Sequence, residues 1–289
     1  MPPLRRALPV AIAPIVAACY FTTDFTGLSS GATVEGGTTP IEAGKDGGGE
    51  AGMMDGAPAP DGGPGSSYRD MVVADQPLAY WRLGDTDNFA KDEVGSSHGQ
   101  YVGRAIHGPG IPGTNTAAVF DGSNYVDFGN GFGFEDRATF SIEAWIQPTS
   151  TGSDTNCIVA KNEGPNGSSP SQGWGIYLDP PPSRALNASR WRDSSEDGAY
   201  ASTFPSGKLS HLVTTYDGSN MVIWIDGQRA AEQSGVTKSL ARTPNNLTGG
   251  ASRGGGACRF VGTIDELAIY NAPLAEARIQ AHYQRGLTP

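Results

Sequence analysis

The sequence has little charge, few basic residues and few cysteines, and each shortage excludes a class of protein. Only 17% of its 289 residues are charged, and 30 acidic residues against 20 Lys and Arg give a formal net charge of −10. Nucleic acid and anionic membrane surfaces are excluded as partners because both require a basic face. Three cysteines exclude a small disulfide-built fold and a four-cysteine zinc site, and allow one disulfide with one odd thiol.

Glycine and proline are abundant, with 41 and 21 residues respectively. Many turn-forming residues combined with low charge are typical of an all-β sandwich or barrel that follows a low-complexity segment. This composition argues against a helical bundle.

The first 19 residues have the features of an export signal. Two arginines precede an apolar stretch over residues 7–18, which Pro9 and Pro14 interrupt. A bilayer-spanning helix needs about 20 apolar residues, so this stretch is too short. Residues 16–19 resemble the lipobox of bacterial lipoproteins, which implies an acylated Cys19, membrane contact through the lipid anchor alone, and a location at the outer membrane or cell surface. The alternative is an ordinary cleaved signal with an incidental Cys19.

A different composition follows the signal. Residues 22–67 contain 13 Gly, 4 Pro, seven acidic residues and one Lys. Such a segment cannot bury enough apolar area to offset its ordering entropy, so we predict a disordered, flexible tether over residues 20–67. The predicted organisation is therefore a signal peptide (1–19), this linker (20–67) and one folded domain (68–289).

The folded domain is predicted to be almost entirely β. Ser66 or Ser67 can cap a short helix over 68–74, and a second helix is expected over 273–283, with Leu274, Ala277, Arg278 and Ala281 on its packing stripe. No strand is followed by a long helix and another strand, so the sheets should be antiparallel. Strands are predicted at 78–83, 117–120, 125–128, 139–147, 158–161, 174–178, 209–216, 221–225 and 260–270.

Six segments together resemble the LamG-like family of concanavalin A-like jelly rolls. They occur in order at residues 78–85, 119–126, 140–146, 211–218, 225–227 and 262–271. The resemblance covers residues 68–285. It implies a two-sheet antiparallel jelly-roll sandwich in an extracellular protein that serves adhesion or glycan binding. Pro180 to Pro182 and the polar stretch 190–196 depart from the family pattern and are expected to lengthen loops.

The sequence does not favour an enzyme. Glucanases of this superfold carry their acid and base as E-x-D-x-x-E on one strand, and this run is absent. Glu143 has no acidic residue two or four positions later, and the adjacent Asp265 and Glu266 should point to opposite faces of a strand. We therefore expect a non-catalytic binding or adhesion module for a glycan or a cell-surface protein. A structural surface module and, less favoured, a glycoside hydrolase are the alternatives.

Three tryptophans are candidates for sugar stacking. Trp145 and Trp224 lie out of phase with the apolar residues of their strands, and Glu143 shares the face of Trp145. Trp191 lies among charged residues in an expected loop. The alternative for Trp145 and Trp224 is packing under a crossing loop or the terminal helix.

Asp265 is expected to be buried, because period two groups it with Leu267 and Ile269. Its carboxylate would then be satisfied either by backbone amides of a loop or by Ca²⁺. Structural Ca²⁺ is implied by the resemblance, with Asp121 or the Gly122 carbonyl as a second source of oxygen.

The two remaining cysteines, Cys157 and Cys258, lie beside predicted strands in a domain that we expect to be exported. A disulfide between them is predicted, with two buried thiols as the alternative.

Overall fold

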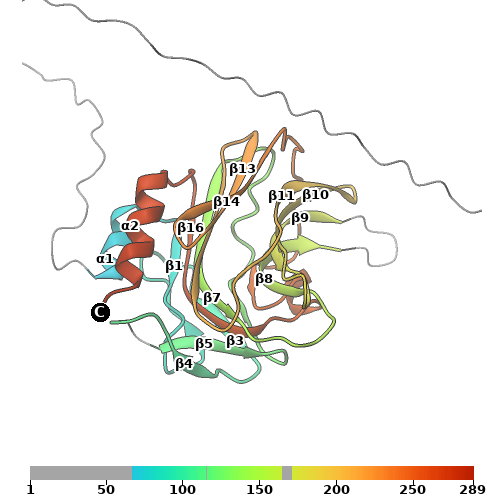
Figure 1. Cartoon of the computed structure of the whole chain (residues 1–289). Helices are drawn as coiled ribbons and strands as arrows, with labels where there is room; N and C mark the ends of the chain where they lie inside the picture. The colour runs from blue at the N-terminus through green and yellow to red at the C-terminus, as the bar shows by residue number, and fades with distance from the viewer. Residues whose placement is uncertain (1–66, 115, 165–170) are drawn as a thin grey trace, which may run out of the picture. The chain divides into compact units, whose positions relative to one another are not determined.

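The computed structural model describes residues 67–114, 116–164 and 171–289, which form two antiparallel sheets packed face to face (Figure 1). The predicted signal peptide with Cys19, and the linker up to residue 66, lie outside the described residues. Within the described part, no helix is long and apolar enough to span a membrane.

The first sheet contains eight strands. Its path runs β14-β13-β12-β7-β16-β5-β4, and β1 joins it by pairing with the second half of β16. The strands are β1 (Ala79–Trp81), β4 (His107–Pro109), β5 (Thr116–Asp121), β7 (Phe140–Pro148), β12 (Ser210–Tyr216), β13 (Asn220–Ile225), β14 (Gln228–Ser234) and β16 (Val261–Tyr270).

The second sheet also contains eight strands, in the order β11-β10-β9-β8-β15-β6-β3-β2. The short 3₁₀ helix η1 (Arg253–Gly255) follows β15 in the chain and contacts β8, β15 and β6. The strands are β2 (Phe89–Ala90), β3 (Gly99–Val102), β6 (Tyr125–Asp127), β8 (Asn156–Glu163), β9 (Gln172–Leu178), β10 (Leu186–Arg192), β11 (Ser195–Ala201) and β15 (Thr248–Gly249).

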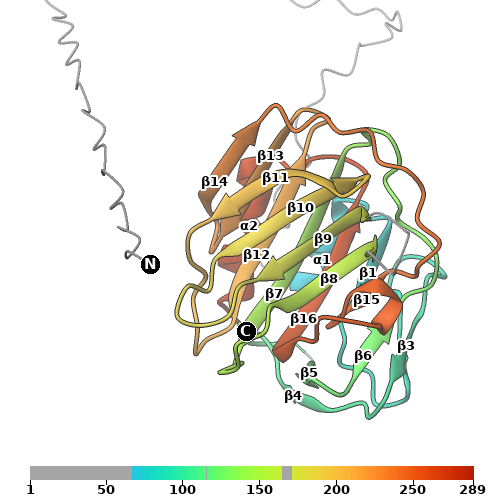
Figure 2. The same cartoon turned by 90° about the vertical axis from the view of Figure 1, so that its right-hand side faces the viewer.

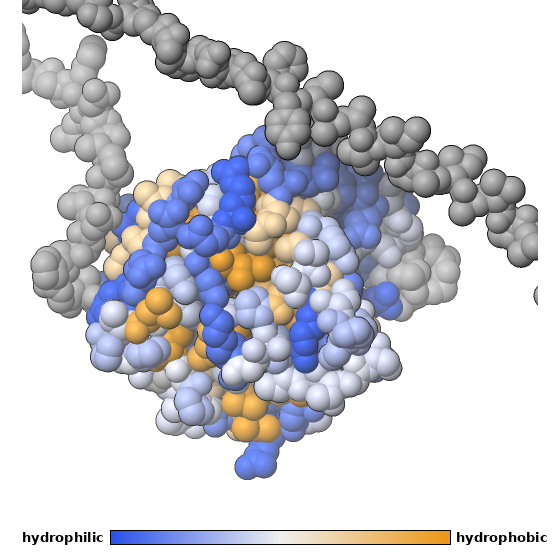
Figure 3. Space-filling model, in the orientation of Figure 1, coloured by the Kyte–Doolittle hydropathy of each residue, from blue (hydrophilic) through white to orange (hydrophobic). Residues whose placement is uncertain are grey.

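The two sheets enclose an apolar core. Inward-facing side chains of both sheets form one cluster, in which Phe140 of β7 stacks on Trp174 of β9 with ring centroids 5.8 Å apart. At the end of the sandwich that faces the viewer, hydrophobic residues are visible between flanking hydrophilic ones (Figure 3). The predicted jelly-roll architecture is confirmed.

Every strand expected from the sequence is present, but the stretch at 190–196 was wrongly interpreted. It does not lengthen a loop, because β10 and β11 form a hairpin there in which Arg192 pairs with Ser195. Inward-facing Leu186 and Ala188 alternate with outward polar residues along β10, and small side chains give this pattern little apolar signal.

Two helices lie on the outer face of the first sheet (Figure 1). Helix α1 (Tyr68–Ala74) begins at the predicted cap, where Ser67 and Asp70 form a reciprocal capping box. Helix α2 (Glu276–Gly286) starts three residues later than predicted, and it buries Ile279, His282 and Gly286 instead of the expected stripe.

The predicted disulfide is present between Cys157 of β8 and Cys258, with Cα atoms 5.5 Å apart. It links the second sheet to the segment between η1 and β16. This segment therefore cannot move far from β8.

Candidate functional site

The outer face of the first sheet does not offer the predicted stacking surface. Trp145 is only 1% exposed and stacks on Tyr283 of α2, while Trp224 is 4% exposed and packs against Ile279 of the same helix. Gly286 lies so close to Trp145 that a Cβ there would be 2.2 Å from the indole ring. Neither tryptophan is available for stacking, and both pack under the terminal helix, which is the alternative that the sequence analysis gave for them.

Glu143 lies in the same covered region and is fully buried. Its carboxylate accepts hydrogen bonds from the hydroxyls of Tyr68 of α1 at 2.8 Å and Tyr270 of β16 at 2.6 Å. Ring nitrogens of His211 of β12 and His282 of α2 lie 2.8 and 2.9 Å from the same carboxylate. Glu143 therefore joins both helices to three neighbouring strands and has no access to a ligand.

The charges in this cluster stabilise one another. Burial alone would raise the pKa of Glu143, but the charge of His282 and hydrogen bonds from both histidines lower it well below its usual range. Burial alone would lower the pKa of His282, but Glu143 and Asp75 raise it to about 9. His282 Nε2 lies 3.0 Å from Asp75 Oδ2, directly beyond the end of α1.

Asp265 is buried as predicted, but on the opposite face of the sheet. A bulge between Asp265 and Ala268 places Glu266 at φ 53°, so Asp265 pairs with Trp145 and faces the helices, whereas Leu267 faces the core. The period-two argument failed because the extra residue of a bulge reverses the alternation. Asp265 Oδ2 accepts the backbone N–H of Ile111 at 2.9 Å, the amide arrangement that was one of the two expectations.

The residues expected to hold Ca²⁺ do not form one site. Asp121 pairs with Val261, four positions before Asp265 along β16, and its carboxylate accepts the backbone N–H and hydroxyl of Ser123 within its own turn. Gly122 lies in that same turn. Burial and the charge of Glu266 raise the pKa of Asp265 well above its usual range. Over the described ranges, no group of three or more His, Cys, Asp and Glu side chains is placed to hold a metal ion.

The outer face of the second sheet is different, because neither α1 nor α2 covers it (Figure 2). Trp191 lies on this face at the end of strand β10, and not in a loop as expected, and it packs edge-on against Tyr177 of β9 at 5.3 Å. The neighbouring positions of β9 that lie next to these two rings are glycines, so no side chain there competes with the rings for space. Gly173 lies opposite Trp191, and a Cβ on Gly175 would be 2.4 Å from the Tyr177 hydroxyl.

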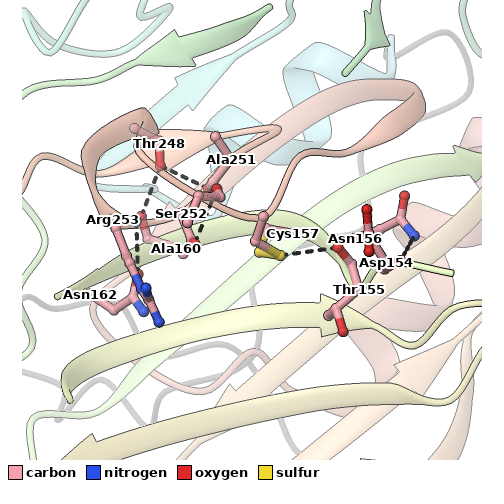
Figure 4. Close-up of a disulfide and its surroundings, with 12 residues drawn as sticks. Asp154, Thr155, Asn156, Cys157, Ala160, Asn162, Thr248, Ala251, Ser252 and Arg253 are labelled. Carbon is pink, nitrogen blue, oxygen red and sulfur yellow. Dashed lines mark hydrogen bonds between the residues drawn. A yellow bond between two sulfur atoms is a disulfide. The ribbon is translucent and has the colours of Figure 1, made fainter. Parts of the chain in front are cut away.

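A pocket of about 270 Å³ opens beside these two rings. Asn162 of β8 and Arg253 of η1 lie next to one another at its wall, where Asn162 Oδ1 accepts the Arg253 backbone N–H at 3.1 Å (Figure 4). The hydroxyl of Tyr177, which also lines this pocket, is buried and has no hydrogen-bond partner among the described residues. Aromatic faces with amide, hydroxyl and guanidinium groups make a surface that can bind a polyhydroxylated ligand.

Sequence reasoning selected Trp191 but missed Tyr177 and Arg253. The signal for Tyr177 was present, because Gly173, Gly175 and Tyr177 alternate with the apolar residues of β9. Arg253 carried no signal, since its place depends on how the 250–260 segment folds over β8. Of the other predicted site residues, Glu143, Trp145 and Trp224 lie on the covered face of the first sheet, away from Trp191.

The His282 charge gives a testable pH dependence. Because its folded pKa of about 9 exceeds the ordinary 6.5, the stabilisation is full below pH 6.5 and is lost as the pH rises through 9. His282→Gln should therefore lower the free energy of unfolding by on the order of 3 kcal/mol at pH 6, and by much less at pH 10. Urea denaturation of both proteins between pH 6 and 10 measures this. His107→Gln on edge strand β4 is the control, and a pH-independent loss in His282→Gln would contradict the assignment.

Asp265 gives a second prediction. Asp265→Ala should lower the free energy of unfolding by roughly 1–3 kcal/mol, because it leaves the Ile111 N–H without an acceptor. Asp265→Asn keeps a neutral acceptor and should cost much less. Thermal and urea denaturation compare the two variants, with and without EDTA. Equal losses in both variants would contradict the amide contact, and a wild-type melting temperature lowered by EDTA would show that a bound cation contributes to stability.

Comparisons with known proteins identify the fold. Domain 4 of an extracellular GH43 arabinanase from Geobacillus stearothermophilus, solved with arabinotriose, is 18% identical with a TM-score of 0.51, over 72% of this chain and 98% of that one. The Trypanosoma rangeli sialidase with sialic acid is 14% identical with a TM-score of 0.50, and the match covers 71% of this chain and 32% of the sialidase. The botulinum neurotoxin serotype G binding domain is 11% identical with a TM-score of 0.56, over 72% of this chain and 51% of that one. No curated protein matches. The family model of the concanavalin A-like lectin/glucanases superfamily matches residues 120–280, and the chain therefore belongs to this superfamily.

Proposed function

We propose that this protein is a non-catalytic glycan-binding module displayed on a lipid anchor, and that sugars bind on the outer face of the second sheet. The observation that carries the proposal is the pocket beside Trp191 and Tyr177, on the face that the helices leave uncovered. Flat apolar sugar faces stack on aromatic rings, and amides and hydroxyls around them accept and donate hydrogen bonds.

The family supports a ligand of this class. The fold is shared with domains whose structures contain sugars, including the arabinanase domain with arabinotriose. At this level of identity the fold alone is common, so the ligand must be argued from this chain's own pocket.

The placement of carboxylates supports binding without hydrolysis. A glycosidase needs two carboxyl groups at about 5–10 Å that face one sugar. Glu143, Asp265 and Glu266 are all fully buried beside the helices, and none of the described residues that line the Trp191 pocket is acidic. The lining side chains can hold a sugar but supply no acid and base pair.

Trp191 tests this function. Trp191→Ala should weaken glycan binding by about tenfold or more, if a sugar stacked on the ring contributes as much as the roughly 1–3 kcal/mol of a nucleic-acid base stacked on an aromatic side chain. The measurement is a glycan array followed by calorimetric titration of the strongest hit. Trp191→Phe should retain part of the affinity.

The matched control is Trp224→Phe on the covered face, which should leave binding unchanged. Failure of the full-length protein to bind any glycan would refute the proposal and leave a structural surface module as the better reading. Release of reducing sugar from any polysaccharide would refute the absence of catalysis.

The lipid anchor is tested separately. Mass spectrometry of protein purified from a membrane fraction should show a mature N-terminus at Cys19 that carries acyl chains, and Cys19→Ala should move the protein to the soluble exported fraction. A mature chain that begins after Cys19 would remove the anchor.

A further inference from the structure

Two pockets adjoin at the Cys157–Cys258 disulfide. Cys258 lines the Trp191 pocket and also a larger one of about 560 Å³, whose wall contains Thr149, Asp154 and Arg259. Figure 4 shows residues 154–156, which lead into β8, on one side of Cys157 and residues 248–253 on the other. A ligand longer than one sugar can extend from the aromatic pocket past the disulfide into the second pocket.

Each pocket contains one arginine that is held in place without an ion pair. Arg253 lies against Gly164, where a Cβ would be 1.9 Å from its Nε, so the glycine leaves the space that the guanidinium occupies. The Arg259 guanidinium lies over the ring of Tyr125, 4.7 Å from its centroid. No described acidic side chain forms an ion pair with either arginine, and residues 165–170 of the sequence contain no acidic residue.

Several described arginines form no ion pair, and Arg253 and Arg259 are two of them that also line pockets. The chain has a net charge of −10, and several of its other arginines are neutralised, as Arg82 is by Glu266 and Arg229 by Glu232. A planar guanidinium with free N–H groups binds carboxylate or sulfate oxygens through paired, charge-assisted hydrogen bonds.

We propose that the site selects acidic oligosaccharides, whose sugar rings stack at Trp191 and Tyr177 while anionic groups pair with Arg253 and Arg259. This inference rests on the proposed glycan binding and adds the ligand class. Carboxylated and sulfated sugars share the required chemistry.

Two carboxylates at the margins set limits on this selectivity. Asp154 is exposed at the wall of the Arg259 pocket, and Glu196 on β11 pairs across the strand with Trp191. The Glu196 carboxylate is engaged by the Ser189 hydroxyl. Asp154 opposes an incoming anion, so its removal should strengthen binding.

The test is an array of oligogalacturonate, oligoglucuronate, sialyllactose, heparin oligosaccharides and neutral arabino- and xylo-oligosaccharides, applied to the full chain. The acidic oligosaccharides should give the strongest binding signals. Comparing the carboxylated with the sulfated oligosaccharides shows which of the two anions the site prefers. The strongest carboxylated hit is then titrated beside its methyl ester, which keeps the sugar rings and removes the charge. The ester should bind about tenfold more weakly or worse, as a lost charge-assisted contact predicts.

Charge variants place the effect at the two pockets. Arg253→Gln and Arg259→Gln should each weaken the acidic hit by about tenfold, and Asp154→Asn should strengthen it. Arg229→Gln makes the same change in net charge on the other sheet and should leave the affinity unchanged.

The failures of the two proposals are distinct. Hits confined to neutral oligosaccharides, equal binding of acid and ester, or equal effects of Arg253→Gln and Arg229→Gln overturn the acidic selectivity and leave glycan binding standing. The absence of any hit overturns both.

Discussion

The buried carboxylate of Glu143 is the interaction on which one half of the structure depends. An isolated charge at that depth would be strongly destabilising, and it is tolerated because groups from α1, α2, β12 and β16 all donate to it or lie within bonding distance. Each helix therefore supplies part of what the sheet needs to bury Glu143. In return, the helices cover Trp145 and Trp224, which turns this face of the sandwich into a second, partly polar core.

Because the helices cover only the first sheet, the two sheets differ in how much of their outer faces solvent can reach. The helices cover the outer face of the first sheet around β7, β12, β13 and β16, while its edge strand β14 stays exposed, and the second sheet keeps its outer face open with Trp191, Tyr177 and two pockets beside the disulfide. On the open face, Trp191 and Tyr177 lie on paired strands, and the disulfide ties the segment that carries Arg253 and Arg259 to β8. Binding of a ligand to a face built in this way would cost little conformational freedom.

Alternation along strands made the fold predictable, and the capping serine made α1 predictable. The site was less accessible for three physical reasons. A single bulge at Glu266 reversed the face of Asp265, the small inward side chains of β10 hid a strand around Trp191, and the covering of Trp145 by α2 depends on tertiary packing that spacing does not encode. Both covered tryptophans were correctly placed out of phase with the core, but being out of phase does not imply exposure when a helix lies above.

The pairing of β16 has a consequence for how the chain reaches this fold. This late strand lies between β7 and the early strands, with Ala79 opposite Ile269 and Asp121 opposite Val261. A nascent chain that lacks residues 261–286 lacks β16, the strand that joins β7 to β5 and β1 in the first sheet. Until β16 is made, each of these three strands has an edge without a partner. Folding must wait for contacts between opposite ends of the domain, which makes it slow and exposes the unfinished chain to aggregation until synthesis is complete.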